Sequence, residues 1–149
     1  MRRRLWVVAV VVALAGCSSS PSQPPAETET PLSSTSTTPV VDDPALATDL
    51  RQFAVDTALA DDDRTLLVDW LRANTTGKDV IRAGVPQEWT VGDKTGSADY
   101  GGRNDIAVLW PPGRHPIVIV VLTSRDKQGA ERSDALVADA ARVVARVLG

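Results

Sequence analysis

The sequence predicts an α+β domain, in which an antiparallel sheet of about three strands packs against helices. Three runs rich in β-branched or aromatic residues follow one another, at residues 89–97, 104–110 and 117–123. The segments between them, residues 98–102 and 111–116, are rich in turn residues and short enough for hairpins. Apolar residues at helical spacing precede and follow the three runs. The predicted order is therefore two helices, a three-stranded meander and one closing helix.

Residues 1–17 have the pattern of a bacterial export signal. Arginines at positions 2–4 begin it, and the unbroken apolar run at residues 5–13 is too short to span a bilayer as a permanent helix. Leu14-Ala15-Gly16-Cys17 follows and closely resembles a lipobox, in which the cysteine is acylated before the signal is cut. We therefore expect an exported lipoprotein that is anchored to the cell membrane through Cys17. A plain cleaved signal peptide is the alternative.

Residues 18–43 are predicted to be a disordered tether, because Ser, Thr and Pro dominate and large apolar side chains are almost lacking. Cys17 is the only cysteine, so no intramolecular disulfide can form and stability must come from packing. The formal net charge of −3 and the dispersed basic residues argue against a nucleic-acid partner.

Residues 44–149 carry the predicted domain. Asp43-Pro44 is a good helix start, and a second helix begins with the carboxylates at positions 61–63 and ends near residues 74–77. Ser133 is the expected cap of the closing helix. The apolar faces predicted for the three helices are Leu46, Leu50, Phe53 and Ala54; Leu66, Leu67, Trp70 and Leu71; and Leu136, Ala140, Val143, Val144 and Val147. Trp70 is expected in the core.

A cluster of donors lies on the first predicted strand and just beyond its turn. Lys94 supplies a positive charge, Thr95 a hydroxyl group, and Gly96 a place where no side chain blocks a ligand along the strand. Ser97 adds a hydroxyl group and a backbone N–H that can face a developing oxyanion. Arg103 returns across the turn, where its guanidinium can fork onto a carboxylate. The pattern favours an anionic ligand, although a Lys-Thr-Gly triplet alone is a weak signal.

The surrounding block, NTTGKDVIRAGVPQEWTVGDKTGSADYGGRNDIAVLWPPGRHPIVIVVL, strongly resembles the C-terminal part of class A serine β-lactamases. The resemblance covers roughly residues 45–149. It implies a partial β-lactamase/transpeptidase-like fold, a β-lactam as the small-molecule partner, and no cofactor.

The resemblance also implies a role for each donor. Lys94 gives electrostatic support, the Thr95 hydroxyl binds the substrate carboxylate, and Arg103 reinforces that carboxylate site. The amide at Ser97 is half of the oxyanion hole, and Gly96 belongs to the same strand. All of these roles bind or stabilise, and none of them breaks a bond.

The residues that break the bond in this family have no counterpart at matching places. The only Ser-x-x-Lys, Ser124 to Lys127, lies downstream of Lys94 at a strand end, and Ser133-Asp134-Ala135 only partly matches Ser-Asp-Asn. No acid occupies a matching omega loop; the glutamates are Glu27, Glu29, Glu88 and Glu131. His115 lies in a Pro-rich turn without partners for a triad or a metal site. We therefore expect a truncated, inactive family member.

Two alternatives stay open. The chain can be a membrane-tethered module that binds β-lactams or cell-wall peptide carboxylates without turnover, or one half of a split enzyme whose complementing chain supplies the serine and the glutamate. A structural difficulty accompanies the main interpretation, because residues 117–122 are apolar on both faces and expect a strand on each side. Without the second neighbour, an aggregation-prone edge is expected.

Overall fold

The computed structural model describes residues 7–14 and 44–148 and has an α+β architecture. Its sheet has four antiparallel strands in the order β1-β4-β3-β2. Strands β2 (Thr90–Ala98), β3 (Gly102–Trp110) and β4 (Ile117–Ser124) confirm the three predicted strands. The predicted tether, the lipidation residue Cys17 and the helix-capping Asp43 lie outside the described residues.

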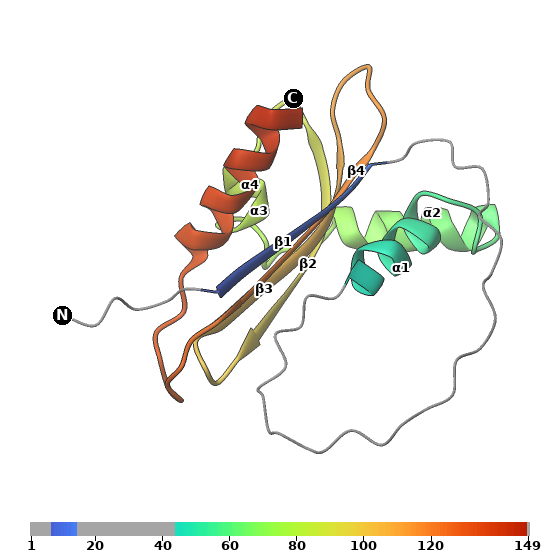
Figure 1. Cartoon of the computed structure of the whole chain (residues 1–149). Coiled ribbons are helices and arrows are strands. Elements are labelled where there is room, and N and C mark those ends of the chain that lie inside the picture. Colours follow the sequence, from blue (N-terminus) through green and yellow to red (C-terminus); the bar gives the residue numbers. More distant parts are fainter. Residues whose placement is uncertain (1–6, 15–43, 149) are drawn as a thin grey trace, which may run out of the picture.

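The fourth strand, β1 (Val7–Leu14), comes from the apolar run of the predicted export signal. It pairs with β4 along its whole length, from Val7 opposite Ser124 to Leu14 opposite Ile117. The expectation that residues 117–122 keep an unpaired edge is therefore not met. In Figure 1, β1 lies along the sheet as the blue strand.

Helices cover both faces of the sheet (Figure 1). On one face lie α3 (Ile81–Gly84) and α4 (Asp134–Leu148); on the other lie α1 (Pro44–Ala54) and α2 (Asp61–Arg72). Two core clusters lie on opposite faces of the sheet, and successive residues of β4 join them in turn, because side chains alternate along a strand. Ile117, Ile119 and Val121 join one cluster, and Val118 and Val120 join the other. None of the described helices is long and apolar enough to cross a membrane.

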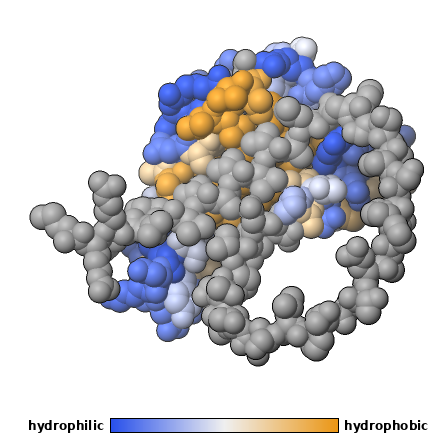
Figure 2. Space-filling view, viewed as in Figure 1, coloured by the Kyte–Doolittle hydropathy of each residue, from blue (hydrophilic) through white to orange (hydrophobic). Residues whose placement is uncertain are grey.

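The closing helix α4 confirms its predicted cap, since the Ser133 Oγ accepts a hydrogen bond from the Leu136 N–H at 3.2 Å. Its predicted buried face is only partly right. Val144 is buried, but Val143 and Val147 are exposed, and Val137 and Ala141 point into the core instead. Figure 2 shows apolar surface over the C-terminal part of this helix.

The predicted faces of α1 and α2 are also shifted. Leu50 and Leu71 are buried as expected, whereas Phe53 and Leu66 are exposed. The prediction that Trp70 lies in the core is wrong, because 66% of this residue is exposed. These helices therefore carry more apolar side chains than the sheet beneath them covers.

Candidate functional site

The β2–β3 hairpin brings Arg103 back to the predicted ligand strand. Ser97 is the register partner of Arg103, and Gly96 is the partner of Asn104. Gly101 has a positive φ of 64° in the turn between the strands, a conformation that glycine adopts without strain. The predicted return of the arginine across the turn is thus confirmed.

Thr95 and Arg103 are linked through a residue that sequence reasoning did not select, Thr76. The hydroxyl oxygens of Thr76 and Thr95 lie 2.6 Å apart and share a hydrogen bond. The Arg103 Nη2 donates to the Thr76 carbonyl oxygen at 3.2 Å. The loop after α2 therefore joins the hydroxyl and the guanidinium into one cluster.

Asp134, at the start of α4, fixes the direction of Arg103. The Arg103 Nε donates to Asp134 Oδ1 in a partly buried ion pair. Only 14% of the arginine side chain is exposed, so the ion pair and the Thr76 contact leave it little freedom. The guanidinium is thus pre-oriented before any ligand arrives, which reduces the entropy lost on binding.

Lys94, Gly96 and Ser97 lie on the exposed part of β2. The Lys94 Nζ donates to the Thr95 carbonyl oxygen at 2.8 Å. No carboxylate within the described part of the chain forms an ion pair with this lysine, so its charge is available to an anion. A Cβ atom at Gly96 would meet only Asn104 Cβ, at 3.8 Å, so the backbone here is open to a ligand.

A buried acid of β2 itself, Asp93, holds the Thr76 loop in place. Asp93 is fully buried and accepts hydrogen bonds from Arg82 Nε and from Asn74 Nδ2, each at 2.5 Å. Arg82 also donates to the carbonyl oxygens of Leu71 and Arg72 at the end of α2. This network ties the end of α2 and the following loop to β2.

A second acid, Asp105, is also fully buried one strand away. Its Oδ2 accepts a hydrogen bond from the Ile81 N–H at 3.1 Å, whereas its Oδ1 has no partner among the described residues. Burial, and then the charge of Asp93, raise the pKa of Asp105 from 3.8 to about 7. The carboxyl group is thus close to half-protonated at neutral pH.

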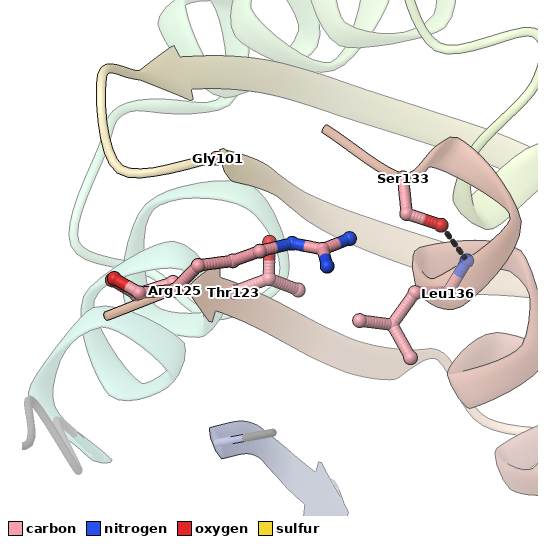
Figure 3. Close-up of a pocket in the computed structure, with 6 residues that line it drawn as sticks. Gly101, Thr123, Arg125, Ser133 and Leu136 are labelled. Atoms are coloured by element: carbon pink, nitrogen blue, oxygen red, sulfur yellow. Dashed lines mark hydrogen bonds between the residues drawn. The ribbon is translucent and has the colours of Figure 1, made fainter. Parts of the chain in front are cut away.

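A shallow depression lies beside this cluster but does not contain the predicted donors. It is lined by Gly101, Thr123, Ser124, Arg125, Ser133 and Leu136. Figure 3 shows the Arg125 side chain extending along it and Ser133 bonded to the backbone of Leu136. The cluster of Thr76, Thr95 and Arg103 therefore does not line this depression.

Apart from Asp134, the other sequence candidates lie away from the cluster. Ser124 ends β4, is exposed, and donates only a long hydrogen bond of 3.5 Å to the Arg125 carbonyl oxygen. Glu88, Glu131 and His115 are exposed in loops. Glu27 and Glu29 lie outside the described residues.

Sequence reasoning missed the residues that position the donors: Asn74, Thr76, Arg82, Asp93, Asp105 and Asp134. One signal was available, because an acid in the middle of an apolar strand needs a cation or a donor near it. That signal applies to Asp93 and Asp105. The partner of Arg103 lies 31 residues away on another element, and no local pattern indicates it.

The α+β fold is that of part of a β-lactamase, and the chain belongs to the β-lactamase enzyme family. The family model described as "Beta-lactamase enzyme family" matches residues 26–148. The resemblance of the sequence to the class A enzymes is thereby confirmed.

Individual relatives agree. The chain is 70% identical to a β-lactamase of Amycolatopsis lactamdurans over 105 residues, which are 70% of this chain and 35% of that protein. It is 54% identical over 104 residues to a β-lactamase of Bacillus licheniformis, covering 70% of this chain and 34% of the relative. The solved β-lactamase from Streptomyces albus G matches with a TM-score of 0.70 and 53% identity, over 71% of this chain and 40% of that structure. The chain thus spans about a third of the length of these curated relatives.

Proposed function

We propose that residues 44–148 form the substrate-binding wall of a class A β-lactamase site, which holds the acid group of a β-lactam. The observation that carries this proposal is the cluster of Thr95, Thr76 and Arg103, in which two hydroxyl groups and a pre-oriented guanidinium lie together. A planar guanidinium with a neighbouring hydroxyl suits a carboxylate, because both can donate to its two oxygens. The exposed Lys94 adds long-range attraction.

The exposed backbone of β2 completes the binding surface. A lactam whose acid group meets Thr95 and Arg103 can lie along Gly96, where no side chain intervenes. Its carbonyl oxygen then comes near the Ser97 N–H, a donor suited to the oxyanion that forms when a lactam ring opens. This geometry supports the roles that the family resemblance implies.

We further propose that this chain by itself does not hydrolyse β-lactams at an appreciable rate. Hydrolysis through an acyl-serine needs a nucleophile with its base, and no Ser-x-x-Lys precedes Lys94 in the sequence. The binding surface and the oxyanion donor alone retain only a small part of the acceleration of such enzymes. The proposed function is therefore binding without turnover.

Equilibrium binding of a penicillin to the purified chain tests the first proposal. Arg103→Ala should weaken binding by roughly 10- to 100-fold, since a hydrogen-bonded charge contributes about 1.5 to 3 kcal/mol. Arg103→Lys should recover only part of the loss, because lysine lacks the planar fork. Arg146→Ala, which removes an arginine in the last turn of α4, is the control with the same change of charge. Equal affinities of Arg103→Ala and Arg146→Ala would contradict the proposed site.

A chromogenic cephalosporin tests the second proposal separately. We expect no turnover above the buffer rate by a chain that still binds penicillin. Rapid hydrolysis, or a penicilloyl adduct on any serine, would overturn the non-catalytic assignment without affecting the binding site.

A second candidate is the split enzyme, and the exposed apolar residues of α2 favour it. Leu66 and Trp70 lie on a helix face that the described chain leaves uncovered. A complementing chain that carries the serine and the glutamate could cover this face and complete the site. Hydrolysis should then appear on mixing the two chains, and should be lost with Leu66→Gln/Trp70→Gln.

A further inference from the structure

The outer edge of β4 forms a binding site for one apolar β-strand. Every residue of β4 has a register partner in β1, and the whole interior stretch from Ile117 to Val121 is buried. On its other side β4 pairs with β3. Without β1, this central strand would present a row of unpaired backbone N–H and C=O groups beside apolar side chains, which is the situation that favours pairing with another strand.

The sequence of β1 suits that place better than it suits a helix. Five of its eight residues are valines, in VVAVVVAL. Valine is stiff at χ1 and packs well on a pleated surface, so it favours strands over helices. Helix α1 contacts β1 as well as β4, so the added strand also enters the layer beneath this helix.

The same eight residues lie within the predicted export signal. A backbone segment that is hydrogen-bonded to β4 cannot at the same time lie in a bilayer, because the two states place the same residues in different surroundings. We propose that the outer edge of β4 captures Val7–Leu14 of its own chain, and that this pairing competes with insertion of the segment into a membrane. The folded domain then retains its N-terminal segment, and membrane insertion removes the fourth strand. This proposal does not depend on β-lactam binding.

Cross-linking in the full-length chain tests the register. Val10 faces Val121, and Val11 faces Val120. In a Cys17→Ser background, Val10→Cys/Val121→Cys and Val11→Cys/Val120→Cys provide two adjacent pairs, which differ in geometry because antiparallel pairs alternate. At least one pair should form a disulfide within a single chain on mild oxidation. Val10→Cys/Val118→Cys is the control, since Val118 is the partner of Ala13 and the two Cα atoms lie beyond disulfide reach.

The competition is measured with the same protein. Flotation with phosphatidylglycerol vesicles should recover several-fold less of the oxidised, cross-linked chain than of the reduced chain. Equal recovery would show that pairing does not withhold the segment and would overturn the proposal. It is also overturned if neither register pair closes, if the control closes equally well, or if the disulfides join two chains.

Discussion

At the scale of single residues, the buried acids of β2 and β3 determine how the proposed site is held. Asp93 has two close donors and lies against Gly77, while Asp105 has one donor and one oxygen without a partner among the described residues. A buried carboxylate with incomplete hydrogen bonding favours its neutral form. The protonation of Asp105 therefore affects the stability of the fold.

The raised pKa of Asp105 predicts that the domain loses stability as pH rises. Because the folded pKa of about 7 exceeds the ordinary aspartate pKa of 3.8, the folded state binds the proton more tightly. The stability that the protonated Asp105 adds to the folded state is complete below pH 3.8. It declines as pH rises and is lost above about pH 7. Asp105→Asn should flatten the dependence and raise the free energy of unfolding at pH 8 by up to roughly 4 kcal/mol.

Urea unfolding at several pH values between 4 and 8 measures this effect. The control is Asp49→Asn, which makes the same substitution at an exposed aspartate of α1. An unchanged slope in Asp105→Asn would show that another group produces the pH dependence.

Gly77 and Gly96 should respond oppositely to alanine. A Cβ atom at Gly77 would lie 1.8 Å from Asp93 Oδ2, so the loop must shift, and we expect a loss of about 1 to 3 kcal/mol of stability. Gly96→Ala meets ordinary contact distances and should leave stability nearly unchanged while weakening penicillin binding. Denaturation and binding measured on both variants test this difference. An equal loss of stability in the two variants would contradict the prediction.

At the scale of elements, the helices differ in how firmly the sheet holds them. Helix α4 buries Val137, Ala141 and Val144 in the core, whereas Leu71 is the one buried residue of α2. The side chains of Leu66 and Trp70 project from α2 without cover from the described residues. Such a face favours association with other apolar surfaces.

We therefore expect the polar double substitution Leu66→Gln/Trp70→Gln to reduce self-association and leave the stability nearly unchanged. Leu71→Ala is the matched change on the buried side of the same helix and should cost about 2 to 5 kcal/mol. Sedimentation velocity and urea unfolding separate the two effects. A large destabilisation by the double substitution would mean that this helix face is covered in solution.

At the scale of the whole molecule, the N-terminal region has two proposed fates. Its apolar run is a strand of the sheet, and the same run precedes the proposed lipidation residue Cys17. When the chain is produced with export, metabolic labelling with palmitate should give a labelled membrane protein, and Cys17→Ser should abolish the label. Secretion of an unlabelled product would instead favour a plain cleaved signal peptide.

Much of the local structure could be predicted from the sequence. The β-branched runs gave all three strands of the meander, the turn residues gave the β2–β3 hairpin, and Ser133 gave the cap of α4. The relative positions of Lys94, Thr95 and Arg103 could be predicted because a strand and a tight turn fix them. These features depend on residues close together in the chain.

The tertiary structure decided what depends on residues far apart. The sequence did not indicate that Asp134 would orient Arg103, that Thr76 would join Thr95, or that β1 would cover β4. It also predicted burial for Trp70, which is exposed, because helical spacing defines an apolar stripe but not whether a partner lies against it. The sequence by itself determined the three strands of the meander, the helices α1, α2 and α4, and the chemical groups that they carry, since local preferences act over a few residues. Only packing decided which apolar faces are covered and which charges meet, because those energies depend on neighbours that the fold brings together.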